Sequence, residues 1–156
     1  MASLLSLPIR HKVFAYITYQ QRLLVFRHRD FPEAGLQVPT GTLEPGEETA
    51  VGVLREAWEE TGLTKLQIVS CLGEQQRDMS DFGKLELHHR TFFHLQCLQQ
   101  PPEQWSHAEN HTNDGREPIW FELFWVAITA VPPLIADHDY FLPVLHQRMT
   151  NDPSKP

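Results

Sequence analysis

Cysteine is scarce in this chain of 156 residues, which contains only Cys71 and Cys97. Two cysteines are too few for the disulfide framework of a small secreted scaffold. Each lies in an apolar, strand-like stretch, where a free buried thiol is the ordinary interpretation. We therefore expect both cysteines to have a structural role.

The sequence also lacks a long apolar run and a stripe of basic residues. No stretch approaches the roughly 20 apolar residues of a membrane-spanning helix, and the apolar run before Pro8 is too short for a signal peptide. The formal net charge is −7, so broad electrostatic attraction to nucleic acid is not expected. These absences favour a cytoplasmic protein that acts on neither membranes nor nucleic acid.

The length and the apolar content of 41% suit one domain over residues 1–156 with short terminal tails. Six β-rich runs separated by turn signals are expected at 11–20, 22–29, 35–41, 65–76, 85–97 and 118–128. Helices are predicted from near Glu48 to Thr61, ended by Gly62, and over 138–149. This order of elements suits a mixed β-sheet with helices on both faces, an α/β fold.

Three glutamates, Glu56, Glu59 and Glu60, fall on one face of the first predicted helix because they are three and four residues apart. Like charges at these spacings destabilise a helix by a few tenths of a kcal/mol per pair, so the cluster favours a bound cation. Carboxylate oxygens suit Mg²⁺ or Mn²⁺, whereas zinc prefers His or Cys, which residues 41–63 lack. Because Mg²⁺ held by carboxylates normally shares phosphate oxygens with a substrate, the cluster predicts phosphate chemistry.

The segment from Gly41 to Leu63 resembles the Nudix box, G-x5-E-x7-R-E-U-x-E-E-x-G-U, where U is aliphatic. The matching residues are Gly41, Glu47, Arg55, Glu56, Glu59, Glu60, Gly62 and Leu63. Every charged position is present, and only Ala57 at the first U is smaller than usual. The chain is therefore identified from its sequence as similar to the Nudix hydrolases.

The resemblance implies a Nudix-type α/β/α sandwich and a metal-dependent hydrolase that cleaves a diphosphate bond in a nucleoside diphosphate linked to another moiety. Water would attack phosphorus in this reaction. An alternative is a Nudix-fold nucleotide-binding or regulatory module without hydrolysis, although such domains generally lose box carboxylates. An isomerase acting on an isoprenoid diphosphate would want a catalytic cysteine near the box. No familiar substrate signature follows the box, and a homodimer is possible.

The resemblance also assigns roles within the box. Glu56 and Glu60, one helical turn apart, are expected to be the principal Mg²⁺ or Mn²⁺ ligands, and the backbone carbonyl of Thr40 is the family's usual neutral ligand. Glu59 either completes the metal shell or acts as the general base. We expect Arg55 to pair with Glu47 and so to fix the loop against the helix.

Residues outside the box offer further candidates. Arg27, near the end of a strand, could meet a substrate phosphate or base, or could simply face water. The polar segment from Gln99 to Pro118 reads as a long loop, and such loops often carry function. Among its carboxylates we consider Glu109, Asp114 and Glu117, of which Glu117 is our candidate because it precedes the last strand. Trp105, in the same segment, either stacks on a base or fills core space.

Overall fold

The computed structural model describes residues 7–109 and 117–151. Its strands are β1 (Ile9–Tyr19), β2 (Arg22–His28), β3 (Thr40–Thr42), β4 (Leu66–Asp78), β5 (Leu87–Cys97), β6 (Gln104–Glu109) and β7 (Ile119–Ala127). Its helices are α1 (Thr49–Thr61) and α2 (Leu142–Thr150), with short 3-10 turns η2 (Pro32–Ala34), η3 (Ser80–Phe82) and η4 (Ile135–Asp137). These elements confirm the predicted order of strands, helix, strands and helix.

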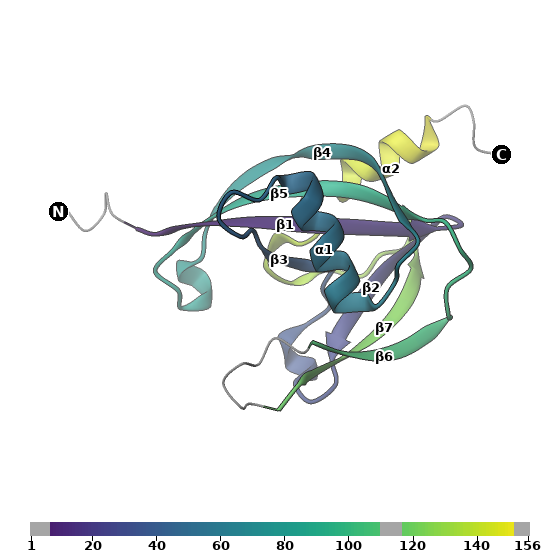
Figure 1. The fold of residues 1–156 in the computed structure, drawn as a ribbon, viewed down its shortest axis with the longest axis horizontal. Coiled ribbons are helices and arrows are strands. Elements are labelled where there is room, and N and C mark those ends of the chain that lie inside the picture. Colours follow the sequence, from purple (N-terminus) through teal and green to yellow (C-terminus); the bar gives the residue numbers. More distant parts are fainter. Residues whose placement is uncertain (1–6, 110–116, 152–156) are drawn as a thin grey trace.

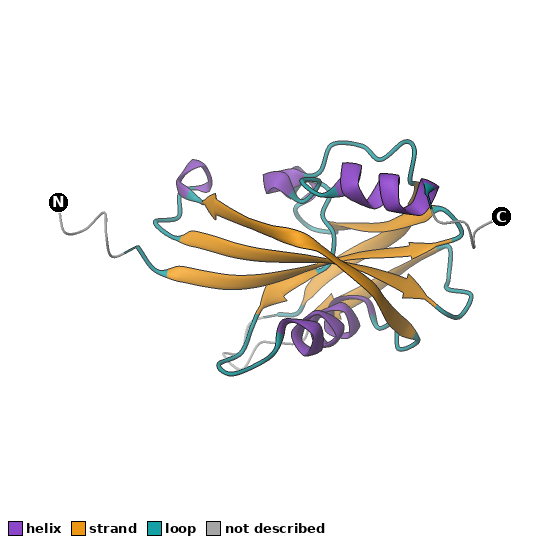
Figure 2. Ribbon diagram, turned by 90° about the horizontal axis from the view of Figure 1, so that it is seen from above, coloured by secondary structure: helices purple, strands orange, loops and turns teal. Residues whose placement is uncertain are grey.

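The seven strands form one mixed sheet in the order β4-β5-β1-β2-β7-β6, and β3 pairs with β1 (Figure 1). Strands β1 and β5 are parallel, whereas the other pairs are antiparallel. Helix α1 covers one face and α2 the other (Figure 2). The α/β/α sandwich expected from the sequence is therefore confirmed.

Side chains alternate between two buried cores, as they must on a pleated sheet. On the α1 face, Leu24 and Phe26 of β2 share a core with Val53 and Ala57 of α1. On the α2 face, Leu23 and Val25 of β2 share a core with Leu145 and Met149 of α2. Any side chain of a strand can thus be assigned to the α1 face or the α2 face.

Along the edge away from β5, strand β1 divides its length between two partners, and this division places the start of the box. Its end pairs with β2 through Tyr19 and Arg22, across a hairpin turn in which Gln20 and Gln21 both have positive φ, at 49° and 64°. Two positive φ values are what a two-residue hairpin turn of type I′ requires. Its first half instead pairs with β3, so the segment that leads into α1 is held in the sheet.

Three expectations about secondary structure are corrected. The segment 35–41 contributes only a bridge at Gln37 and the short strand β3. Helix α2 begins at Leu142, four residues later than predicted, because Pro143 occupies its first turn, where a missing N–H costs nothing. The presumed loop from Gln99 to Pro118 contains β6, which pairs with β7 along its whole length.

Two further expectations from the sequence concern the two cysteines and membrane-spanning helices. Cys97 is buried and Cys71 is exposed on β4, and both are free thiols, so the expectation of burial is wrong for Cys71. Strand β4 lies at the edge of the sheet and its residues alternate toward solvent. Within residues 7–109 and 117–151, no helix has the length and apolar character needed to cross a membrane.

Candidate functional site

Helix α1 and the loop before it hold the charged residues of the box together. The helix runs from Thr49 to Thr61, and Gly62 follows in the left-handed conformation with φ 78° and donates its N–H to the Trp58 carbonyl. Both helix ends therefore lie where the sequence predicts them. Leu43 N–H donates to the His11 carbonyl at 2.9 Å, which fastens the loop to β1.

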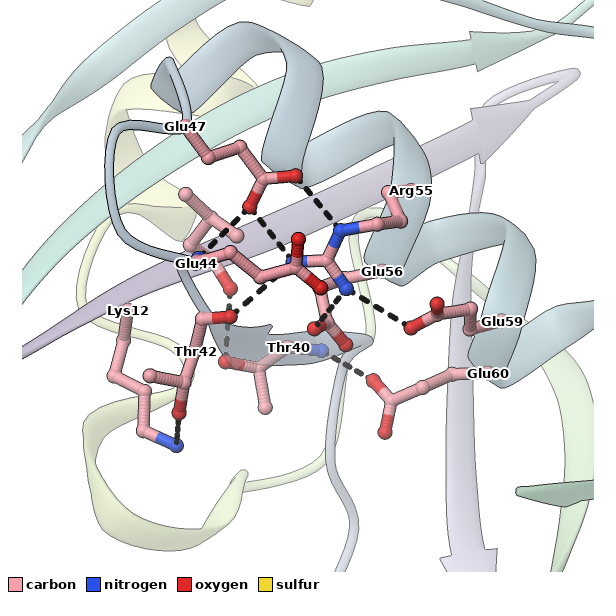
Figure 3. A network of polar contacts seen from close by, with 10 residues as sticks. Lys12, Thr40, Thr42, Glu44, Glu47, Arg55, Glu56, Glu59 and Glu60 are labelled. Atoms are coloured by element: carbon pink, nitrogen blue, oxygen red, sulfur yellow. Dashed lines mark hydrogen bonds and ion pairs between the residues drawn. The ribbon is translucent and has the colours of Figure 1, made fainter. Parts of the chain in front are cut away.

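The guanidinium of Arg55 lies at the centre of this cluster (Figure 3). Its Nε and Nη2 donate to the two carboxylate oxygens of Glu47 at 2.7 and 2.8 Å. Its Nη1 donates to Glu56 at 2.8 Å and to Glu59 at 3.1 Å. The expected pair of Arg55 with Glu47 is thus present in bidentate form, and Arg55 also neutralises two carboxylates that the sequence assigns to a metal.

The bond with Arg55 and an N–H bond from Glu44 lower the pKa of Glu47 to about 2. Both interactions favour the ionised carboxylate. Nη2 of Arg55 also donates to the Thr42 carbonyl at 3.2 Å. The loop is therefore attached to α1 by charge-assisted bonds to a side chain and by a bond to the backbone.

Glu56 and Glu60 are largely buried, with exposed fractions of 8% and 5%. Burial raises the pKa of both carboxyl groups, because a charged group loses hydration in the protein interior. Arg55 opposes the shift at Glu56, and the Thr40 N–H, which donates to Glu60 at 2.5 Å, opposes it at Glu60. Two buried carboxylates side by side are costly unless a cation compensates them.

Gly41 allows β3 to approach this pair closely. A Cβ atom placed on Gly41 would lie 1.9 Å from Cδ of Glu56, far inside any possible contact. Gly52 on α1 is similarly crowded, because a Cβ there would lie 2.3 Å from Cδ2 of Leu43. The loop and the helix can therefore pack at this distance only while both positions lack a side chain.

Lys12 and Glu109 join the site from strands outside the box. Nζ of Lys12 donates to Thr42 Oγ1 at 2.9 Å, and its charge acts on Glu56 and Glu60. Burial, followed by the charge of Lys84, lowers the pKa of Lys12. The charge of Glu109, on β6, raises the pKa of Glu56 and of Glu60. The sequence offers one indication that Lys12 belongs to the site, namely a charged residue next to the apolar run of β1.

Two candidates from the sequence lie away from this cluster. Arg27 lies on the α2 face of β2, where it pairs with Glu122 at 3.3 Å and lies over the Phe124 ring at 5.1 Å. Glu117 is exposed just before β7, whereas the charge of Glu109, from the same segment, acts on Glu56 and Glu60. Asp114 falls outside the described residues.

The donor set suits a hard divalent cation, since its side-chain oxygens are all carboxylates. Within the part of the chain that the structure describes, no group of three His, Cys, Asp or Glu residues is already arranged to hold a metal ion. The reason lies in the geometry, because the oxygens of Glu47, Glu56 and Glu59 converge on Arg55 and Glu60 turns to Thr40. A metal ion that took the Glu56 and Glu59 oxygens now bonded to Arg55 would have to replace Arg55 there.

An open pocket of about 450 Å³ lies beside the same loop. It is lined by Arg10 and His11 from the start of β1 and by the loop from Thr42 to Glu47. Because Glu47 both lines this pocket and binds Arg55, the pocket adjoins the charged cluster. A small molecule would have space there next to the loop.

Comparison with proteins of known sequence finds weak relatives. Diphosphoinositol polyphosphate phosphohydrolase 2 of Mus musculus is 27% identical over 104 residues, which cover 67% of this chain and 51% of that protein. Diphosphoinositol polyphosphate phosphohydrolase NUDT4B of Homo sapiens is 29% identical over 105 residues, with coverage of 67% and 51%. The chain thus spans about half the length of these curated relatives.

Solved structures share the fold at low sequence identity. The MutT protein from Methanosarcina mazei Go1 superposes with a TM-score of 0.63 and 19% identity, over 94% of this chain and 99% of that one. The E. coli dihydroneopterin triphosphate pyrophosphohydrolase gives 0.63 and 18%, over 94% and 100%. A UDP-X diphosphatase gives 0.62 and 19%, over 92% and 65%.

A model of the NUDIX domain matches residues 9–145, which is most of the chain and includes the whole box. This match agrees with the spacing of Gly41, Glu47, Arg55 and the three helix glutamates, and with the sandwich fold. The chain therefore belongs to the Nudix family.

Proposed function

We propose that this protein is a metal-dependent hydrolase that cleaves the diphosphate bond of a nucleoside diphosphate linked to another moiety. The observation that carries the proposal is the pair of buried carboxylates Glu56 and Glu60, gathered with Glu47 and Glu59 around one arginine. Such a concentration of negative charge has no structural benefit by itself, because burying carboxylates costs free energy. It suits a site that binds a cation during function.

Mg²⁺ or Mn²⁺ is the proposed cofactor, held by Glu56, Glu60 and the backbone carbonyl of Thr40. The Thr40 N–H already contacts Glu60, and in an extended strand the N–H and C=O of one residue point to the same side. When bound, the ion would neutralise the bridging phosphates and polarise a water molecule. Glu59 would either complete the metal shell or act as the general base for that water.

Other residues would position the substrate and the loop. Arg55, released from Glu56 and Glu59, would stay bound to both oxygens of Glu47 and keep the loop against α1. Lys12, whose charge already acts on Glu56 and Glu60, would bind a substrate phosphate. Glu109 is the further carboxylate that we place at the edge of the site, in preference to Glu117.

The alternative is a nucleotide-binding or regulatory module without hydrolysis. The retention of every charged box residue counts against it, because a module that only binds has no need to keep Glu56, Glu59 and Glu60 together. The two functions differ in one measurement. The binding module would retain a nucleotide intact in the presence of metal, whereas the hydrolase would convert it.

The test is a screen for hydrolysis with Mg²⁺ or Mn²⁺, followed by ³¹P NMR in H₂¹⁸O. The panel contains nucleoside triphosphates, ADP-ribose, dinucleoside polyphosphates, nucleotide sugars, cap analogues and, given the curated relatives, diphosphoinositol polyphosphates. We expect at least one compound to be cleaved with ¹⁸O incorporated into a phosphate product. Attack at carbon, which leaves the phosphate without ¹⁸O, would contradict the proposed chemistry.

Glu60→Gln is the paired variant, and Glu122→Gln, on the α2 face of β7, is its matched control. We expect Glu60→Gln to lower kcat by at least about 100-fold, the scale of losing one electrostatic stabiliser of the transition state. Its thermal stability should be equal or higher, because a buried charge is removed. Equal background turnover by the wild type and Glu60→Gln on every compound would refute the hydrolase proposal.

A further inference from the structure

The C-terminal end of α1 is held by two side chains of β6. Nε1 of Trp105 donates to the Thr61 carbonyl at 2.8 Å, and Nε2 of His107 lies 2.9 Å from the Glu59 carbonyl. A carbonyl oxygen only accepts, so Nε2 of His107 must carry the proton of this bond. Both donors come from the segment in which the sequence indicated only a loop.

These two bonds supply donors where a helix has none of its own. The last four carbonyls of an α-helix lack partners within the helix. In α1, the Gly62 N–H satisfies the Trp58 carbonyl, and β6 satisfies the carbonyls of Glu59 and Thr61. The turn secured in this way carries Glu59 and Glu60.

The box glycine Gly62 has a second role in this arrangement. Its φ of 78° already favours glycine. A Cβ atom on Gly62 would also lie 3.1 Å from both Cε1 and Nδ1 of the His107 ring, which is tighter than ordinary packing. Gly62 therefore both ends α1 and leaves the space in which His107 reaches the helix.

Alternation along β6 links this contact to the acidic cluster. Trp105, His107 and Glu109 are two residues apart and point to one face of the strand. The first two contact the end of α1, and the charge of the third acts on Glu56 and Glu60. The same face of β6 thus fixes the last turn of α1 and places a carboxylate beside the site.

We propose that Trp105 and His107 are positioning residues, which hold the last turn of α1 so that Glu59 and Glu60 present their carboxylates to the metal and the substrate. The role of the metal in this statement rests on the proposed function. The positioning itself is a property of the free protein. Without these donors the last turn of α1 unwinds more often, and the spacing between Glu56 and Glu60 is lost for part of the time.

The test compares His107→Phe and Trp105→Phe, which remove the donors and keep an aromatic ring, with His107→Gln, which retains a side-chain N–H. Trp125→Phe is the matched control, because it removes an indole donor whose bond goes to the Pro102 carbonyl at 2.9 Å and not to a carbonyl of α1. The first measurement is amide hydrogen exchange at Thr61, Gly62 and Leu63, without metal or substrate. The second is Mn²⁺ binding followed by EPR.

We expect both donor-removing variants to exchange these three amides about 10-fold faster than the wild type, through local opening of the turn. Their Mn²⁺ affinity should fall by about 10-fold, the scale of losing a group that orients metal ligands. His107→Gln should recover most of both values, and Trp125→Phe should retain them. If His107→Phe does not fold, Trp105→Phe decides the result.

Wild-type exchange at the end of α1 in both variants would overturn the proposal, as would unchanged Mn²⁺ affinity in variants that exchange faster. These outcomes are distinguishable from a failure of the proposed function. If the wild type cleaved no compound and bound no Mn²⁺, the hydrolase assignment would fail, whereas the exchange measurement would still test whether β6 holds the helix.

Discussion

The two faces of the sheet each carry an arginine with many contacts, and the two arginines have opposite surroundings. Arg55, on the α1 side, donates to three carboxylates, and two of them, Glu47 and Glu56, raise its pKa. Arg90, on the α2 side, is fully buried, lies 4.8 Å over the Phe14 ring and donates to the Ala136 carbonyl at 2.6 Å. Burial and the nearby charge of Arg77 lower the pKa of Arg90 to about 10.

This difference distinguishes a candidate functional site around Arg55 from a structural contact around Arg90. Around Arg55 the carboxylates outnumber the cations, so the α1 face has negative charge to offer a ligand. Around Arg90 the contacts are the Phe14 ring, a backbone carbonyl, a thioether and the His88 ring nitrogen, and the carbonyl bond holds the turn η4 against the sheet. In this protein, buried charged residues therefore indicate a functional site only where charges of one sign outnumber those of the other, as the carboxylates do around Arg55.

Among the variants that compare the two faces, Gly41→Ala on the α1 face has the largest expected effect. The new methyl group would overlap the Glu56 carboxylate, so the ligand must move, and a displacement of about 1 Å at a reacting centre can cost 100-fold in rate. We expect kcat to fall by about that factor with the fold retained. Steady-state kinetics and circular dichroism measure the two effects.

Gly46→Asn is the control for Gly41→Ala, because Gly46 has φ 76° and open space around it, and Asn tolerates this conformation. Its activity should stay near that of the wild type. A fully active Gly41→Ala variant would show that close approach to Glu56 is unnecessary, and the contrast between the two faces would weaken.

A smaller effect is expected from Arg55→Ala, compared with Arg90→Met. Loss of Arg55 frees the loop, so kcat should fall by about 10- to 100-fold, as for other groups that orient ligands. Mn²⁺ affinity should be unchanged or higher, because a competing cation is removed. Arg90→Met should instead lower the free energy of unfolding by about 1–3 kcal/mol, because the Ala136 carbonyl loses its donor.

Kinetics, EPR titration of Mn²⁺ and urea denaturation separate the two arginines. A folded Arg55→Ala variant that no longer binds Mn²⁺ would make Arg55 part of the metal site itself. An Arg90→Met variant that is stable but inactive would place the α2 face in the reaction.

The last effect, which is absent at neutral pH, concerns stability at low pH and His138, on the α2 face. Its Nδ1 accepts the Val38 N–H at 3.2 Å, and burial lowers the pKa of His138 to about 3. In the unfolded chain this histidine binds a proton near pH 6.5, whereas in the folded protein it stays neutral down to about pH 3. The free energy of unfolding should therefore fall as pH decreases from about 6.5 to about 3, by up to about 1.4 kcal/mol per pH unit.

His138→Asn keeps an acceptor near the Nδ1 position and removes the titration. Its unfolding free energy should depend less on pH than that of the wild type over this range, when both are measured by urea denaturation at several pH values. Parallel pH profiles would show that His138 does not carry the effect. Glu56 and Glu60 titrate in both proteins, so they cancel in the comparison.

Local signals account for what the sequence predicts well. The helix bounds follow from the periodicity of residues 48–61 and from Gly62, and the pair of Arg55 with Glu47 follows from the box. The contacts of Arg55 with Glu56 and Glu59 were not expected, because helical angles do not say where a long side chain turns. The family spacing predicts which residues gather, and the structure adds how they are bonded.

Nonlocal pairing accounts for what the sequence missed. The segment Gln104–Glu109 is mostly polar, and it becomes a strand only because β7 offers an edge to it. Lys12 comes from β1 and Glu109 from β6, far from the box in sequence, so their place beside Glu56 depends on strand order. Cys71 is exposed for a similar reason, since nothing in its neighbourhood marks β4 as an edge strand.

The irregular register of β4 affects how the protein resists aggregation. This strand shifts register between Ile68 and Ser70 and again between Cys71 and Gly73, where it pairs with β5. Bulges of this kind twist an edge and interrupt the row of backbone groups that another chain would need for pairing. Although Val69 and Cys71 are exposed there, β4 is a poor template for strand addition and can keep a thiol and an apolar side chain at the surface.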